Sequence, residues 1–135
     1  EISLENDNPE ICTIVEKGEG KFTVKGDAEG TGIITLHVKT DEGEHLARKL
    51  FISVYTRVNT YYGETNKNVF VYRGATENGN VGNDAAKDRL ATKTKIKVIA
   101  TCDKFYLIKL LDGGVFSDNR PTGYVLKEDV DIGEN

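Results

Sequence analysis

Apolar and polar residues alternate along most of this 135-residue chain, in short runs that are separated by glycine-containing turns. A period of two residues places alternate side chains on opposite faces of a β-strand. Three runs in the first half each put an apolar set on one face: Phe22 and Val24; Ile34, Leu36 and Val38; and Leu50, Ile52 and Val54. We expect the last of these sets, Leu50, Ile52 and Val54, to be buried. Residues 26–30 and 41–44 are predicted turns, and Gly43 is suited to a positive φ in a hairpin.

The second half repeats this pattern with shorter runs that are rich in β-branched and aromatic residues, as strands are. The runs are Val58 to Tyr62, Val69 to Thr76, Lys95 to Ile99, Lys104 to Leu111 and Thr122 to Leu126. Residues 85–90 are predicted to form one helical turn that is capped by Asp84. Acidic residues alternate over 129–134, which we interpret as a solvated strand face or frayed end. The pattern predicts an all-β protein.

Composition narrows the range of functions. The formal net charge is −4, which argues against a general nucleic-acid binder. No apolar run reaches the length of a membrane span. The chain begins with Glu1 and contains no methionine. We therefore expect a processed or excised piece of a longer, multidomain protein.

Residues suited to catalysis or metal binding are few. Cys12 and Cys102 could pair if the protein is exported, but two cysteines in separate halves define no disulfide framework. We interpret both as core or loop residues. His37 lies on a strand face and His45 lies beside a hairpin turn, and we expect structural or solvated roles for both. Because neither a catalytic constellation nor a metal-ligand cluster is apparent, we predict no enzyme activity, no metal and no cofactor.

The first half resembles the bacterial immunoglobulin-like group 2 family. Four segments carry the resemblance in order: Asn8-Pro-Glu-Ile-Cys-Thr-Ile, Gly20-Lys-Phe-Thr-Val-Lys-Gly, Glu29-Gly-Thr-Gly-Ile-Ile-Thr-Leu and Leu50-Phe-Ile-Ser-Val. The resemblance implies an immunoglobulin-like β-sandwich over residues 1–56 whose opening strands are missing. Either those strands lie upstream of Glu1, or a neighbouring molecule or domain covers the exposed edge.

The second half, residues 57–135, resembles the bacterial SH3-like family of small β-barrels. The matching segments are Val58 to Tyr62, Val71-Tyr-Arg-Gly-Ala-Thr, Ile96-Lys-Val, Phe105-Tyr-Leu-Ile and Gly123-Tyr-Val. Phe105 stands where the family favours Trp. The two resemblances together imply an exported bacterial protein of the cell surface or cell wall.

Aromatic residues gather in the second half and suggest a ligand platform through ring stacking and hydroxyl hydrogen bonds. The predicted ligand-binding residues are Tyr72, Tyr106 and Tyr124, flanked by Asp112 and Arg120. The alternative is that these rings only fill the core.

We therefore expect a non-enzymatic binding and adhesion module. Its barrel half would bind peptidoglycan peptide, a cell-surface glycan or a protein. Two alternatives remain open: a purely structural spacer or assembly module, and an accessory targeting region of a larger cell-wall hydrolase.

Overall fold

The computed structural model describes residues 1–77 and 88–133, and these form an all-β protein, as the sequence predicts. Within the described residues there is no α-helix, only two short 3-10 turns, Ser117–Asn119 and Lys127–Asp129. The chain divides into two compact units, Glu1–Val54 (unit 1) and Tyr55–Asn135 (unit 2). The assignment of these units to the immunoglobulin-like and SH3-like families stays a prediction.

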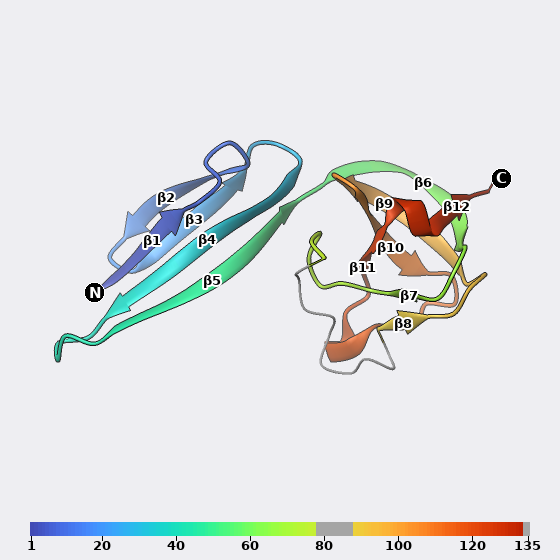
Figure 1. Ribbon diagram of the computed structural model, residues 1–135. Coiled ribbons are helices and arrows are strands. Elements are labelled where there is room, and N and C mark those ends of the chain that lie inside the picture. Colours follow the sequence, from blue (N-terminus) through green and yellow to red (C-terminus); the bar gives the residue numbers. More distant parts are fainter. Residues whose placement is uncertain (78–87, 134–135) are drawn as a thin grey trace. The chain divides into compact units, whose positions relative to one another are not determined.

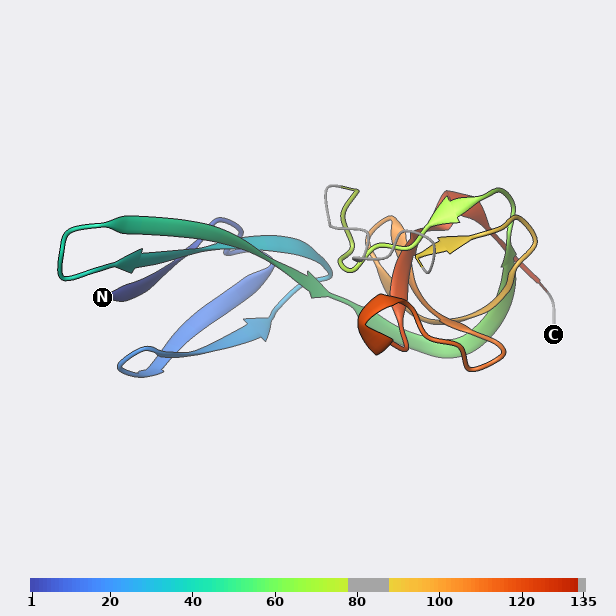
Figure 2. The same ribbon diagram turned by 90° about the horizontal axis from the view of Figure 1, so that it is seen from below.

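Unit 1 contains two antiparallel sheets, which form separate layers (Figures 1 and 2). One sheet has three strands in the order β1-β4-β5, and the other is the hairpin β2–β3. The strands are β1 (Ile2–Asn6), β2 (Cys12–Gly18), β3 (Lys21–Gly26), β4 (Gly30–Lys39) and β5 (His45–Val54). Strand β1 was not among the predicted runs, although Ile2 and Leu4 do alternate with polar residues.

The hairpin β2–β3 covers only one end of the three-stranded sheet. Cys12 lies beneath Gly32, since a Cβ added to that glycine would lie 3.4 Å from Sγ of Cys12. At the other end the layers separate, leaving an open gap of about 480 Å³ beside Ile2 and Glu16. The apolar side chains that are buried in unit 1 are therefore only two, Cys12 and Ile34.

One expectation from the sequence needs correction. Leu50 was expected to be buried with Ile52 and Val54, but its side chain is 39% exposed, whereas Ile52 and Val54 are half-buried. Leu50 has the correct strand parity for the inner face. Ile34, directly opposite it on β4, is buried, so Leu50 owes its exposure to its place on β5, the outer strand of the sheet.

The predicted hairpin between β4 and β5 is confirmed. Thr40 N–H donates to the carbonyl of Glu44 at 2.9 Å, and Gly43 has a φ of 85°. Glycine adopts this left-handed conformation without the steric cost that a Cβ brings. The two strands then pair without a register shift from Gly30 opposite Val54 to Lys39 opposite His45.

Unit 2 is built around a strongly curled five-stranded antiparallel sheet, a half-barrel, with the strand order β11-β10-β9-β6-β12 (Figure 1). A two-stranded sheet, β7–β8, accompanies it. The strands are β6 (Thr56–Thr65), β7 (Val69–Phe70), β8 (Arg89–Leu90), β9 (Lys95–Cys102), β10 (Phe105–Leu110), β11 (Gly123–Leu126) and β12 (Val130–Ile132).

Glycines allow two close approaches in this half-barrel. A Cβ on Gly63 would lie 2.8 Å from the carbonyl oxygen of Asp131, so Gly63 lets β12 lie against β6. A Cβ on Gly123 would lie 2.2 Å from Cγ1 of Val71. Real Cβ atoms essentially never come this close to another heavy atom, so only glycine fits at either position without a rearrangement.

Among the described residues of unit 2, the core consists of two buried clusters of mainly apolar side chains. The larger one contains Val69, Val71, Leu90, Ile96, Val98, Ile108, Phe116, Val125 and Val130. The smaller one contains Ala75, Ala100, Cys102, Phe105, Leu107 and Tyr124. A register shift between Leu107 and Ile108 bends the β9–β10 pair at the point where the two clusters meet.

Two further expectations need correction or lie partly outside the described residues. The helical turn predicted for residues 85–90 includes Arg89 and Leu90, which instead form strand β8; residues 78–87, including its predicted cap Asp84, are not among those described. The acidic run was expected to be solvated, but Asp129 is buried, and its Oδ1 lies 2.9 Å from Nζ of Lys67. Asp131, two residues later, is exposed as expected.

Candidate functional site

Two of the predicted ligand-binding residues, Tyr72 and Tyr124, lie side by side. Their backbones form an antiparallel bridge, with N–H to carbonyl distances of 2.8 and 2.9 Å. Tyr124 is only 6% exposed and belongs to the smaller core cluster. Tyr72 is half-buried, and its ring meets that of Phe105 edge to face, at 5.9 Å between centroids. Both rings therefore serve packing, and only part of Tyr72 is accessible.

Tyr106 lies on the opposite face of the β10–β11 pair. It is paired with Val125, whereas Tyr124 is paired with Leu107, so the two tyrosines have opposite strand parity. The Tyr106 ring meets Tyr61 edge to face at 6.1 Å, and Nζ of Lys127 lies 5.6 Å from its centroid. Burial, followed by the neighbouring Tyr106, raises the pKa of the Tyr61 phenol. The Tyr61 phenol therefore stays uncharged at neutral pH.

Asp112 and Arg120 are both engaged within the protein. Oδ1 of Asp112 accepts a hydrogen bond from the backbone N–H of Gly114 at 2.7 Å, which stabilises a turn. The guanidinium of Arg120 donates to the carbonyl of Ser117 at 3.1 Å and to the buried carboxylate of Asp88 at 3.2 Å. Burial lowers the pKa of Arg120, while Asp88 opposes that change. Of the five predicted residues, the structure thus brings together Tyr72 and Tyr124.

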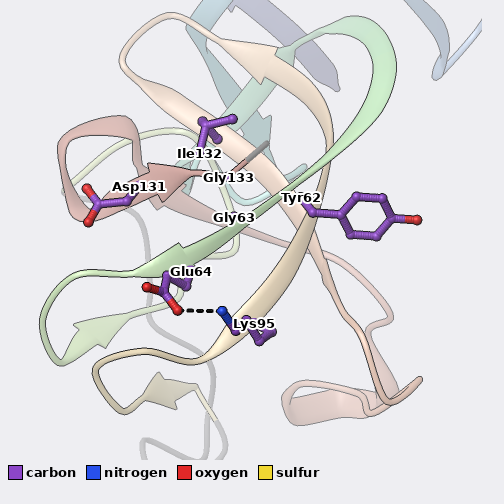
Figure 3. A pocket seen from close by; sticks show the side chains of 7 residues that line it. All are labelled: Tyr62, Gly63, Glu64, Lys95, Asp131, Ile132 and Gly133. Carbon is purple, nitrogen blue, oxygen red and sulfur yellow. Dashed lines mark hydrogen bonds and ion pairs between the residues drawn. The ribbon is translucent and has the colours of Figure 1, made fainter. Parts of the chain in front are cut away.

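A pocket of about 390 Å³ opens elsewhere on unit 2, where β6, β9 and the end of β12 meet (Figure 3). Its lining residues are Tyr62, Gly63, Glu64, Lys95, Asp131, Ile132 and Gly133. Strand register explains how three charges meet there, because Glu64 is paired with both Lys95 and Asp131. Residues paired directly across an antiparallel sheet place their side chains on the same face.

The charges in this pocket are partly compensated. Nζ of Lys95 donates to Glu64 at 2.7 Å, and Oδ1 of Asp131 accepts from Nδ2 of Asn66 at 3.1 Å. The Tyr62 ring, 38% exposed, extends away from the Asp131 carboxylate, so the ring and the acids bound different sides of the pocket (Figure 3). The pocket thus offers carboxylate acceptors, an ammonium donor and an aromatic face. Such a set suits a polar ligand that carries amino, carboxylate or hydroxyl groups.

Sequence reasoning missed this pocket as a site. Tyr62 was only one of several aromatic residues, and Asp131 was interpreted as part of a solvated strand end. The sequence does show that Tyr62 and Glu64 are two residues apart, on either side of Gly63, and would therefore lie on the same face of a strand. Their proximity to Lys95 and Asp131 depends on strand order, which the sequence pattern does not give.

The two histidines of unit 1 interact with each other. Nδ1 of His37 lies 2.8 Å from Nε2 of His45, and the rings stack at 4.9 Å between centroids. Nε2 of His37 lies 3.3 Å from a carboxylate oxygen of Glu5. Among the described residues, no group of three or more His, Cys, Asp or Glu side chains is arranged to hold a metal ion.

The cysteines are buried thiols, as expected, and they do not form a disulfide. Sγ of Cys12 lies 3.9 Å from Oδ1 of Asn6. Burial raises the pKa of the Cys12 thiol, and the acidic neighbours Asp27 and Glu10 raise it further. Cys12 is therefore a neutral core residue.

The fold and the pocket define an all-β protein with several antiparallel sheets and a curled half-barrel in its second unit. No helix within residues 1–77 and 88–133 has the length and apolar character needed to span a bilayer. Comparisons with protein-family models, with curated proteins and with solved structures find no match to this chain.

Proposed function

We propose that this chain is a non-enzymatic binding and adhesion module of an exported bacterial cell-surface or cell-wall protein, and that unit 2 binds a wall-derived ligand. The observation that supports binding is the open pocket with Tyr62, Glu64, Lys95 and Asp131. The cell-wall setting comes from the resemblance of the sequence to bacterial immunoglobulin-like and SH3-like domains.

Among wall components, a peptide fits this pocket better than a neutral glycan. Wall peptides carry both ammonium and carboxylate groups, so the ammonium can meet Asp131 or Glu64 while a carboxylate meets Lys95. An aliphatic stem can rest on the exposed Tyr62 ring, as hydrophobic and aromatic surfaces orient small ligands. Lys95 and Glu64 already pair with each other, and a zwitterionic ligand would exchange one ion pair for two.

The test is a titration of the isotope-labelled chain with soluble wall peptides and, separately, with wall glycan fragments, followed by amide NMR. We expect peptide-induced shifts at Tyr62, Glu64, Lys95 and Asp131. Tyr62→Ala should weaken binding roughly fivefold, since an aromatic contact contributes about 1 kcal/mol. Tyr55→Ala removes an equally exposed ring away from the pocket and should change nothing.

A second test of the pocket neutralises its two carboxylates. Glu64→Gln with Asp131→Asn should abolish ammonium recognition, while Asp41→Asn at the hairpin tip of unit 1 is the matched control. The absence of any shift with every wall peptide and glycan, at millimolar concentration, would refute binding by this pocket.

A second candidate, the structural spacer or assembly module, is favoured by a specific observation. Tyr124 is buried and Tyr72 packs on Phe105, so much of the aromatic set serves the core. If this candidate is correct, neither the wall peptides nor the wall glycans shift any amide resonance in the titration. The third candidate, an accessory region of a larger wall hydrolase, predicts that wall peptides bind while this chain does not cleave them.

A further inference from the structure

Strand β5 presents a long unpaired backbone edge. It is the outermost strand of its sheet, and β4 is the only strand in the described chain that pairs with it. Thr40 and Glu44 form a hydrogen-bonded pair at the turn, and the register continues without a shift. Because hydrogen-bonded and non-bonded pairs alternate in an antiparallel ladder, the even-numbered residues of β5 bond to β4. The N–H and C=O groups of Ala47, Lys49 and Phe51 therefore point outward from the sheet.

The side chains along this edge combine exposed apolar groups with two adjacent cations. Leu46 is 60% exposed, Leu50 is 39% exposed and Phe51 is 43% exposed. Between them lie the exposed Arg48 and Lys49. A long, regular and apolar edge strand is a ready template for another strand, and proteins normally shorten it, bulge it or cover it. Here the ten-residue strand β5 has no bulge.

We propose that the outer edge of β5 binds an extended segment of another polypeptide in which two adjacent acidic residues are flanked by apolar residues. In such a strand addition, backbone hydrogen bonds supply affinity and alternate side chains supply specificity. One acid would lie opposite Arg48, on the face that also carries Leu46 and Leu50. The next acid would lie opposite Lys49, on the face that carries Phe51. This site lies on unit 1 and is independent of the pocket proposed for unit 2.

Charge argues against a second copy of this chain as the occupant. If two β5 strands paired antiparallel about Arg48, about Lys49 or midway between them, cations would lie opposite cations, which is destabilising. Centring the pair on Leu50 avoids that conflict but leaves Arg48 and Lys49 of both copies without an acidic partner. A strand with two central acidic residues and apolar flanks places a carboxylate opposite Arg48 and another opposite Lys49. Its apolar residues then contact the apolar side chains on both faces of β5.

The probe is a blocked peptide with a central Glu-Glu pair flanked by alternating valine and threonine, compared with the same peptide carrying Lys-Lys. Each is titrated into the complete, isotope-labelled chain at low salt. We expect the Glu-Glu peptide to shift the amides of residues 45–51 and to slow hydrogen exchange at Ala47, Lys49 and Phe51. Its affinity should exceed that of the Lys-Lys peptide at least roughly tenfold and should fall at high salt.

Variants separate backbone pairing from charge. Ala47→Pro removes an outward N–H that β4 does not use, so the fold is retained and binding falls roughly tenfold. Arg48→Glu with Lys49→Glu should reverse the preference in favour of the Lys-Lys peptide. Lys17→Glu with Lys21→Glu makes the same change of charge on β2 and β3 and should leave binding unchanged.

Three outcomes overturn the proposal. One is that neither peptide shifts residues 45–51, and another is that both peptides bind equally well. The third is that the protein alone protects the amides of Ala47, Lys49 and Phe51 in a concentration-dependent way, which would identify a second copy as the occupant.

Discussion

Removing the carboxylate of Asp88 should strongly destabilise unit 2. Asp88 is fully buried and accepts hydrogen bonds from the backbone N–H of Ser117 at 3.0 Å and from the Ser117 hydroxyl at 2.5 Å. Its two oxygens also lie 3.2 and 3.3 Å from Nη2 of Arg120. Asp88 thereby joins β8 to the loop that precedes β11.

The magnitude follows from what Asp88→Ala leaves behind. Breaking a buried ion pair costs about 3–5 kcal/mol, and a buried donor left without a partner costs about 1–3 kcal/mol. The Arg120 side chain is 20% exposed, so water can hydrate part of its charge and the lower end applies. We expect a loss of about 3 kcal/mol in the free energy of unfolding. For a unit of this size, that corresponds to a fall in Tm of roughly 12–24 °C.

The assay uses the distribution of tyrosines, because all six lie in unit 2. The tyrosine bands of the near-ultraviolet circular dichroism spectrum and tyrosine fluorescence, followed during urea unfolding, therefore report unit 2. Asp88→Asn keeps one acceptor oxygen and should cost about half as much as Asp88→Ala. Glu128→Ala, which removes an exposed carboxylate, should change stability by less than about 0.5 kcal/mol.

A double-mutant cycle with Arg120→Ala tests the reasoning directly. Because Arg120 has lost its carboxylate partner in Asp88→Ala and keeps only its hydrogen bonds to Ser117, the second substitution should cost less than it does in the wild-type chain, by about 1–2 kcal/mol. The reasoning would be refuted by a loss below about 1 kcal/mol for Asp88→Ala, or by additive effects of the two substitutions.

Three further predictions concern other buried positions. Gly123→Ala should destabilise unit 2 by at least about 2 kcal/mol in urea unfolding, because its Cβ would meet Val71, and adding Val71→Ala should restore part of that loss. Thr65→Val should cost about 1–2 kcal/mol in the same assay, because the Thr65 hydroxyl donates to a carbonyl at 2.6 Å and accepts from Thr94 N–H at 2.9 Å; an unchanged midpoint would contradict this. Cys12 should react with a thiol reagent only as unit 1 unfolds. Burial raises the pKa of the Cys12 thiol in the folded state. The contribution of the neutral thiol to stability is therefore complete below the ordinary thiol pKa of about 8.5 and is lost as the pH rises above that value. Urea unfolding of wild type and Cys12→Ala across this pH range would detect the loss.

The sequence determined the elements that depend on local chemistry. Alternation identified strands β3, β4, β9 and β10 and the faces of Ile34 and Leu36, and Gly43 predicted the hairpin turn. These features follow from backbone sterics and from a side-chain period of two, which neighbouring residues fix among themselves.

The tertiary structure decided which of those faces are covered and which residues meet. Leu50 has the strand parity of a core residue but is exposed, because it lies on the outer strand β5, whereas Ile34, opposite it on the central strand β4, is buried. Tyr106 and Tyr124 both belong to the aromatic set of the second half, but they lie on opposite faces of the β10–β11 pair. Strand order brings Glu64 next to Lys95 and Asp131. Burial and contact between distant segments depend on how strands pair and how sheets stack, and a local pattern carries no information on either.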